Sequence, residues 1–335
     1  MKHLRNPQNN VGSNYPEGYA AMREGAAVID RSQRRLIRLT GKDPVGMLNA
    51  VLTSDVPTQV DRGTYAMLLN PKGRIQTDLR VVKTAGEVFV DTEPEGAEAA
   101  GEILGRYAPF SRVRLEELPD WGVLALYGPR ADELLDNPDL AEHETKQAEI
   151  GGVSVLIVGV AEPVGGYDLI GPSDALGTIR ERLIRRGAVP AGYDVYETAR
   201  IAAGVPRFGA DITPDNFPGE SETSLERAVS FGKGCYPGQE TVARMRYRGS
   251  PNKRLYRFEL EPGPMGPPEA GDEILQVEKD LGDPISSMDV VGRLTSVASF
   301  PVDGKTYALG YLSRKADLEA PMMAEDAKVL AVTRA

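Results

Sequence analysis

The sequence predicts an α+β protein in which two ferredoxin-like antiparallel-sheet units precede a small C-terminal β-barrel. Three observations predict this class. With 335 residues, the chain has room for about two domains of roughly 150 residues each. A strand–strand–helix order occurs twice in the first part of the chain, and short strands without helical periodicity fill the last part. We therefore expect two α+β subdomains over residues 1–250 and a β-barrel over residues 251–335.

The first unit begins with a predicted strand, Arg-Arg-Leu-Ile-Arg-Leu at residues 34–39, and the start of a helix. Asp43 and Pro44 are typical of an N-cap followed by the first helical turn. Turn residues at 70–73 and 85–86 divide the next stretch into a three-stranded meander. The predicted elements are a strand at 34–39, a helix from 44 to about 53, strands at 65–69, 74–83 and 87–91, a helix at 94–107 and a strand near 113.

The same order recurs after residue 150, and the character of the chain then changes. Four prolines between residues 261 and 270 indicate a loop. The stretch beyond it lacks helical periodicity, which favours a closed barrel of short strands. The predicted elements are strands at 153–158 and 167–170, a helix at 173–186, and barrel strands at 273–277, 290–297, 306–312 and 328–332.

Composition excludes several classes of protein. One cysteine and two histidines cannot form an internal disulfide, a four-ligand zinc site or a self-contained iron–sulfur cluster. The net charge of −10 argues against a general nucleic-acid binder. The polar N-terminus lacks a leader-like apolar segment, and glycines interrupt the longest apolar stretch, residues 150–161. We expect a cytoplasmic protein that does not enter membranes.

The single cysteine lies in a glycine-rich loop, with glycines at positions 232, 234 and 238. Lys233 is two residues from Cys235 and would favour its thiolate, which is the nucleophilic and metal-binding form. Polar neighbours such as Gln239 and Glu240 argue against a purely apolar setting. The alternative is a small buried residue that fills the core of the loop.

A basic segment follows the cysteine loop. Residues 241–258 contain six positive and no acidic residues: Arg244, Arg246, Arg248, Lys253, Arg254 and Arg257. The first three alternate, so on a strand they would share one face and bind carboxylates, phosphates or RNA. The alternative is a solvated edge strand protected by its charge. A second group of arginines near the first strand would extend this basic surface: Arg31, Arg34, Arg35 and Arg38.

Asp78 is a further candidate because it lies inside a predicted strand. By alternation it shares a face with Arg80, opposite Leu79 and Val81. A carboxylate there either faces solvent or lines a pocket, where it would accept hydrogen bonds from a ligand or act as a base. His143, between two glutamates, is expected to be exposed.

The cysteine loop carries a family resemblance. Residues 233–240, Lys-Gly-Cys-Tyr-Pro-Gly-Gln-Glu, resemble the signature K-G-C-[FY]-x-G-Q-E of the YgfZ family. Members of that family are folate-binding proteins linked to iron–sulfur-cluster assembly or repair and to tRNA modification. The wider chain resembles the related aminomethyltransferase (T-protein) superfamily of the glycine cleavage system, which implies a folate-binding, aminomethyltransferase-like region before the barrel. The stretches that carry this likeness are 28–32, 52–79, 200–206, 291–296 and 308–311.

The resemblance implies roles for individual residues. Asp78 matches the aspartate that faces the reactive nitrogens of tetrahydrofolate, and Tyr65 matches a tyrosine beside the folate. Cys235 marks YgfZ proteins, whereas Ala202 replaces a glutamate that grips the pterin in T-proteins. The implied candidates are Cys235 and Asp78 for catalysis and Tyr65, Asp78, Lys233, Gln239, Arg244 and Arg246 for the cofactor, with no metal site.

These inferences lead to one function and two alternatives. The leading expectation is an accessory protein that binds tetrahydrofolate or a one-carbon derivative. It would serve iron–sulfur proteins or their assembly machinery, including tRNA-modifying enzymes. The first alternative is a tetrahydrofolate-dependent aminomethyl- or methyltransferase, although Ala202 and Cys235 depart from that pattern. The second is an RNA- or protein-binding module that uses the basic segment.

Overall fold

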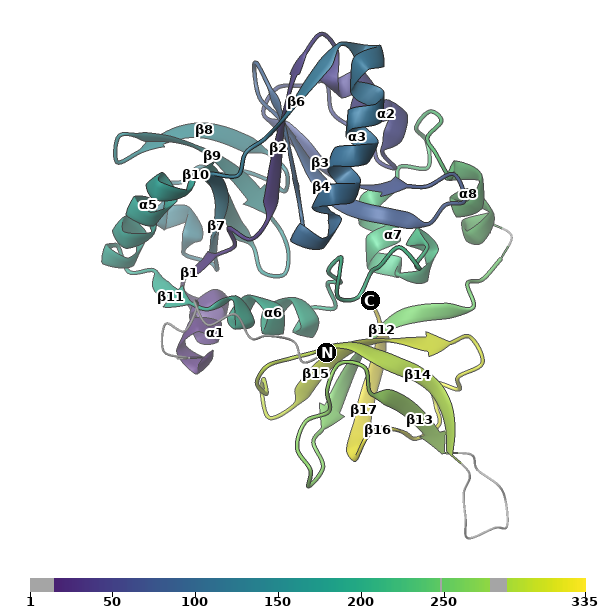
Figure 1. Ribbon diagram of the computed structural model, residues 1–335. Coiled ribbons are helices and arrows are strands. Elements are labelled where there is room, and N and C mark those ends of the chain that lie inside the picture. The colour runs from purple at the N-terminus through teal and green to yellow at the C-terminus, as the bar shows by residue number, and fades with distance from the viewer. Residues whose placement is uncertain (1–14, 248, 278–287) are drawn as a thin grey trace, which may run out of the picture.

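The computed structural model describes residues 15–247, 249–277 and 288–335, which form two β-sheets, their flanking helices and a closed barrel (Figure 1). The first sheet is antiparallel throughout, and its strands lie in the order β3 (Arg62–Leu69), β4 (Ile75–Lys83), β5 (Val88–Thr92), β2 (Arg35–Gly41) and β6 (Val113–Glu117). The order of the second sheet is β11 (Val189–Ala191), β1 (Ala27–Asp30), β7 (Trp121–Tyr127), β10 (Gly166–Pro172), β9 (Val153–Val160) and β8 (Thr145–Ile150).

Helices cover the outer face of each sheet. On the first sheet, α2 (Pro44–Val51) and α3 (Ala97–Ser111) pack their apolar residues against Leu79 and Val81 of β4. On the second, α4 (Ala131–Leu134) and α5 (Ser173–Arg185) pack against β7, β9 and β10. Because side chains alternate along a strand, Asp78 and Arg80 of β4 face the second sheet instead.

The inner faces of the two sheets meet through an apolar part and a polar part. Val82 and Phe89 from the first sheet pack against Val158 and Ile170 from the second. Elsewhere, α1 (Tyr15–Glu24) and α6 (Tyr193–Ala202) cover the inner face of the second sheet. The short 3-10 helix η2 (Pro94–Gly96) leads into α3, and η3 (Pro218–Glu220) leads into α7 (Glu222–Ala228).

The C-terminal β-barrel is confirmed. Its strands are β12 (Lys253–Glu261), β13 (Glu273–Val277), β14 (Met288–Val297), β15 (Thr306–Ser313), β16 (Met322–Ala324) and β17 (Ala327–Arg334), and β12 closes the barrel by pairing with β15 and β17. Phe258 and Leu312 fill its interior. On its outer side, Leu255 and Leu309 pack against Ile201 of α6. The boundary after residue 250 stays a prediction, and the first barrel strand begins at Lys253.

One predicted element is wrong. Arg244 and Arg246 do not lie on a strand but on a helix, α8 (Gln239–Tyr247), and Arg248 lies outside the described residues. Val242 and Met245 have helical spacing: Val242 is buried in the core, and Met245 approaches Gly219. The cationic residues at the end of α8 also complement the helix dipole. Arg244 and Arg246 therefore do not share one face.

Within the described ranges, none of the helices combines the length and the apolar character that a membrane crossing requires.

Candidate functional site

A cavity opens where the polar inner faces of the two sheets meet. Its volume is about 800 Å³, counting the open solvent at its mouth. Both sheets and the segments after α6 supply its walls. Its ionisable lining includes Arg31, Arg34, Tyr65, Asp78, Arg80, Glu93, Glu142, His143, Glu162, Asp168, Arg207 and Arg227.

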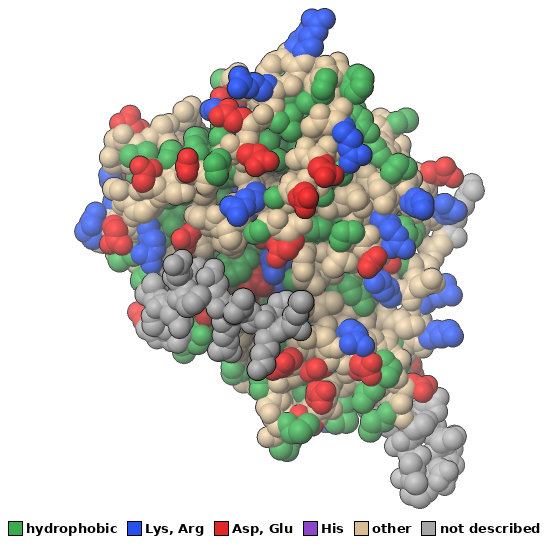
Figure 2. Space-filling model, viewed as in Figure 1, with side chains coloured by type: hydrophobic (Ala, Val, Ile, Leu, Met, Phe, Trp, Pro, Cys, Tyr) green, Lys and Arg blue, Asp and Glu red, His purple; other side chains and the backbone are tan. Residues whose placement is uncertain are grey.

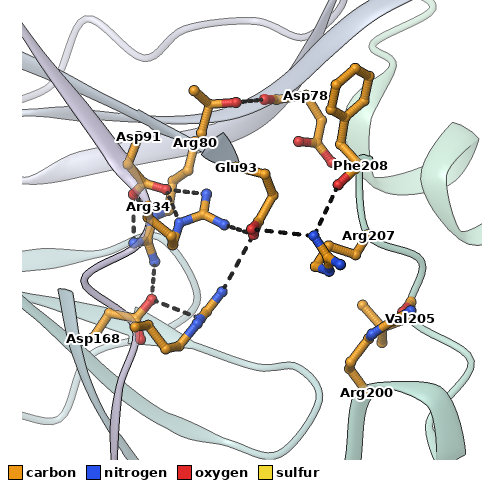
Figure 3. A network of polar contacts seen from close by, with 12 residues as sticks. Arg34, Asp78, Arg80, Asp91, Glu93, Asp168, Arg200, Val205, Arg207 and Phe208 are labelled. Carbon is orange, nitrogen blue, oxygen red and sulfur yellow. Dashed lines mark hydrogen bonds and ion pairs between the residues drawn. The ribbon is translucent and has the colours of Figure 1, made fainter. Parts of the chain in front are cut away.

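Arg80 connects the two sheets across the floor of this cavity. It lies opposite Asp91 in the β4–β5 register, and its Nε donates to Asp91 Oδ2 at 2.7 Å. Its Nη1 donates to Oδ2 of Asp168, on β10 of the second sheet, at 2.8 Å. Figure 3 shows these side chains pointing toward one another between the strands. A buried guanidinium of this kind requires such partners.

Arg34 and Arg31 extend the same buried network. Arg34 Nε donates to Asp91 Oδ1 at 2.8 Å, and its guanidinium also pairs with Glu93. Burial alone would raise the pKa of Asp91, but Arg34 and Arg80 lower it to about 2. Arg31 Nη1 donates to the Tyr127 hydroxyl at 2.6 Å. Arg31, Arg34 and Arg80 are therefore each ion-paired with at least one carboxylate of the cavity.

Asp78 differs from the other carboxylates of the cavity floor. It is only 5% exposed, and the Tyr65 hydroxyl donates to its Oδ2 at 2.6 Å. Within the described part of the chain, this carboxylate has no ion pair with any arginine or lysine. Burial raises its pKa to about 6, against the lowering effect of the Tyr65 hydrogen bond. Asp78 is thus an available acceptor, and it can exchange a proton near neutral pH.

Five residues of the cavity have a buried side-chain atom without a hydrogen-bond partner among the described residues, namely Arg31, Arg80, Glu93, His143 and Arg207. Oε2 of Glu93 is buried and has no hydrogen-bond partner among the described residues, and Arg207 Nη1 lies 3.9 Å from it. His143 Nδ1 is likewise buried without a partner. Burial lowers the pKa of His143 to about 4, so the ring is neutral near pH 7. Such unsatisfied atoms are uncommon in folded proteins and favour a ligand site.

An ion-paired arginine lies at the side of the cavity formed by α7. Arg227 Nη1 donates to Glu162 at 3.0 Å, and its guanidinium also pairs with Glu142. The same guanidinium lies 5.8 Å from the centre of the Tyr65 ring. Arg227 therefore joins α7 to the loops of the second sheet beside the Tyr65–Asp78 pair.

The structure separates the predicted site residues into two groups. Tyr65 and Asp78 line the cavity, whereas the residues of the cysteine loop and of α8 do not: Lys233, Cys235, Gln239, Arg244 and Arg246. Lys233 has a structural position instead. Its ammonium donates to the carbonyl oxygens of Asn49, Leu52 and Ser54 at 2.6–3.1 Å, around the C-terminal end of α2. The geometry thus directs this amine to the backbone, and Lys233 does not line the cavity.

Cys235 is exposed on the outside of the molecule. The next residue, Tyr236, is buried against the ends of β3 and β4 and anchors the loop there. The neighbouring Arg246 guanidinium lies 3.9 Å from the centre of the Phe231 ring. Figure 2 shows Lys and Arg side chains gathered along the edge of the molecule that α8 and β12 occupy in Figure 1. Cys235 is therefore accessible to a partner and separate from the cavity.

Two other expectations are wrong. Arg31 and Arg34 do not extend a basic surface, because Arg31 is buried, the Arg34 side chain is only 11% exposed, and both are paired with carboxylates. His143 does not project into solvent but lines the cavity. The sequence signal for this polar face is the alternation of Asp78 with Arg80 on β4, and of Asp91 with Glu93 at the end of β5.

The two sheets, the charged cavity between them and the barrel define an aminomethyltransferase-type fold. The structure is similar to the glycine cleavage system aminomethyltransferase T from Bartonella henselae, with a TM-score of 0.75 and 21% sequence identity. The match covers 96% of this chain and 88% of that one. Residues 8–233, more than half of the chain, match the family model of the GCVT N-terminal domain. The chain belongs to this family.

Curated relatives carry two kinds of names. A tRNA-modifying protein YgfZ from Colwellia psychrerythraea is 24% identical, over 76% of this chain and 77% of its own length. An aminomethyltransferase from Caldanaerobacter subterraneus is 26% identical, over 79% of this chain and 73% of its own. An uncharacterized Haemophilus influenzae protein is 27% identical, over 70% of this chain and 73% of its own length. The predicted resemblance to YgfZ proteins within the aminomethyltransferase superfamily is thus confirmed.

Proposed function

We propose that this protein binds a reduced folate in the central cavity. The observation that carries the proposal is Asp78, a buried carboxylate held by the Tyr65 hydroxyl and without an ion pair within the described residues. The arginines around the cavity are already paired with carboxylates. Asp78 therefore remains as the acceptor for a ligand that presents N–H groups.

The residues present fit a reduced pterin. Its ring system carries several N–H donors on one edge, and Asp78 and Glu93 Oε2 supply buried acceptor oxygens in the same cavity. A pterin that donates to these oxygens would give Glu93 Oε2 the hydrogen bond that it otherwise lacks among the described residues. When bound, a reduced folate supplies a carrier for one-carbon groups. In this chain, Asp78 would hold and orient the ring, and Tyr65 would fix the rotamer of Asp78.

The proposed role is that of an accessory protein for iron–sulfur proteins, which rests on the resemblance of residues 233–240 to the YgfZ signature. Relatives named tRNA-modifying protein YgfZ agree with that resemblance. Cys235 is the only cysteine in the chain and is exposed outside the cavity. No group of three or more metal-ligating side chains occurs in the part of the chain that the structure describes. A single thiol supplies one of about four ligands that a cluster needs. Cys235 would therefore act on a cluster, metal or adduct that a partner holds, including a tRNA-modifying enzyme.

One observation favours the alternative of a tetrahydrofolate-dependent aminomethyl- or methyltransferase. The pKa of Asp78, raised to about 6 by burial, suits a group that accepts a proton at neutral pH. The curated relative that is named an aminomethyltransferase agrees with the transferase alternative. Against it stand Ala202 in place of the expected glutamate and the position of Cys235 outside the cavity.

Complementation separates the two roles. In a strain from which the gene for this protein is deleted, expression of the wild-type chain should restore the activity of an iron–sulfur enzyme. Cys235→Ala should fail to do so although it still binds folate. Rescue by Cys235→Ala, together with methylene transfer to tetrahydrofolate by the same variant, would reject the accessory role and support the transferase.

A further inference from the structure

A second cavity lies between the barrel and the loop that connects α6 with η3. Its volume is about 1050 Å³, open solvent included. None of its lining residues lines the central cavity. Lys253 of β12 lies opposite Ser313 of β15, and Tyr311 lies opposite Arg293 of β14, so these side chains come from three adjacent strands on the outer face of the barrel. The loop, residues 210–216, forms the facing wall.

Tyr311 supplies the first unusual group of this cavity. Its side chain packs with Leu255 and Leu309, and the residue is only 9% exposed. Its hydroxyl has no hydrogen-bond partner within the described ranges. Burial, and secondarily the charges of Glu220 and Asp211, hold the pKa of this phenol well above its usual value. The hydroxyl therefore keeps its proton and remains a donor without an acceptor.

The neighbouring acidic groups are already occupied. Asp211 accepts from the Thr295 hydroxyl at 2.5 Å and from the backbone N–H of Arg207 at 3.1 Å, and it pairs with the buried Arg200. Glu220 accepts from Asn216 Nδ2 at 2.8 Å. Neither carboxylate reaches the Tyr311 hydroxyl within hydrogen-bond distance.

Lys253 supplies a cation at the same place. Its Nζ lies 4.5 Å from the centre of the Tyr311 ring and 4.0 Å from Glu220 Oε2, beyond a hydrogen bond. The side chain is 41% exposed, so the ammonium lies toward the opening. The Ser313 oxygen accepts from the Lys315 N–H at 3.3 Å, which leaves the Ser313 hydroxyl hydrogen to donate. Three donors, one of them charged, thus belong to one cavity.

We propose that this second cavity is a binding site for a small carboxylate. An ammonium and a phenol hydroxyl match the two oxygens and the single charge of such a group. Glu220 beside Lys253 and Asp215 on the cavity wall make a doubly charged phosphate the poorer ligand. The apolar wall of Val290 and Val291 would contact the carbon part of the ligand. This site does not depend on the folate proposal.

The test uses the full chain with 13Cζ-labelled tyrosine, in which Tyr311→Phe identifies the Tyr311 resonance. Sodium acetate is added in increasing amounts while sodium chloride is reduced to keep the ionic strength constant. Inorganic phosphate is titrated in a separate experiment. We expect acetate to move the Tyr311 resonance saturably. Lys253→Met keeps the alkyl chain over the ring but removes the charge, and should weaken this binding about tenfold or more.

Lys315→Met is the matched control, because it removes an exposed lysine close to the site. It should bind acetate as the wild type does. The proposal is overturned if acetate causes no saturable shift, if Lys253→Met binds acetate as tightly as the wild type, or if phosphate alone saturates the site. Urea unfolding midpoints of the variants establish that each one is folded.

Discussion

The hydroxyl of Tyr65 donates a hydrogen bond to Oδ2 of Asp78 at 2.6 Å, between the neighbouring strands β3 and β4. In the same cavity, the arginines pair with other carboxylates and leave Asp78 without a cation among the described residues. This contrast explains why the pKa of Asp91 is lowered to about 2 while burial raises that of Asp78 to about 6. Two aspartates of one polar face therefore have different chemical roles.

Asp78→Asn should stabilise the protein at alkaline pH. The folded-state pKa of Asp78 is raised above the unfolded value, so its contribution to stability is complete below about pH 4 and is lost as the pH rises through about 6. The neutral amide avoids this loss. We expect Asp78→Asn to exceed the wild type by about 1–3 kcal/mol at pH 8 and by little at pH 4.

Urea unfolding at pH 4, 6 and 8 measures this difference. The exposed Asp120→Asn serves as the control and should show no such pH-dependent gain. A gain for Asp78→Asn that is equal at all three pH values would contradict the assignment.

Asp91→Asn should destabilise the protein strongly. It leaves Arg34 and Arg80 buried without their shared carboxylate, and breaking a buried pair typically costs about 3–5 kcal/mol. Glu116→Gln is the control because Glu116 pairs with Arg38 on the surface, at 2.7 Å, and should leave the unfolding midpoint nearly unchanged. A soluble Asp91→Asn protein with the wild-type midpoint would show that the network does not hold the two sheets together.

Lys233→Met should lower stability without reducing folate binding. The ammonium satisfies three backbone carbonyls around the end of α2, and losing them should cost about 1–3 kcal/mol. The control is Lys72→Met, which removes an exposed lysine from a nearby turn. Denaturant midpoints and folate titrations of both variants provide the measurement. Unchanged stability combined with lost folate binding would instead place Lys233 in the cofactor site.

The Cys235 thiol should react in the folded protein. It is exposed and is the only cysteine in the chain, so one equivalent of a thiol-specific chromogenic disulfide should be consumed without denaturant. Cys235→Ala should retain the wild-type unfolding midpoint, because this side chain fills no core position. A thiol that reacts only after unfolding would be incompatible with its proposed access to a partner.

Features that depend on local patterns were predictable from the sequence. The turn at 70–73, the Asp43 N-cap and the barrel strands depend on residues that are close together in the chain. The structure confirms the cap, because Asp43 accepts from the Gly46 N–H at 2.8 Å. Alternation likewise placed Asp78 and Arg80 on one face of β4.

Features that depend on tertiary contacts were not predictable in this way. Arg34 and Asp168 lie far apart in the sequence, and only the packing of the two sheets brings both to one cavity. The same packing partly buries His143. The charges of Arg244 and Arg246 alone fit both a strand and a helix. In the structure both lie on α8, whose residue Val242 packs into the core.

Calorimetric titration with 5-formyltetrahydrofolate tests the central claim most directly. The wild type should bind, Asp78→Asn should bind about tenfold or more weakly because it replaces the acceptor carboxylate, and Asp120→Asn and Cys235→Ala should match the wild type. Absence of binding by the wild type, or equal binding by wild type and Asp78→Asn, would contradict a folate site built on the Tyr65–Asp78 pair.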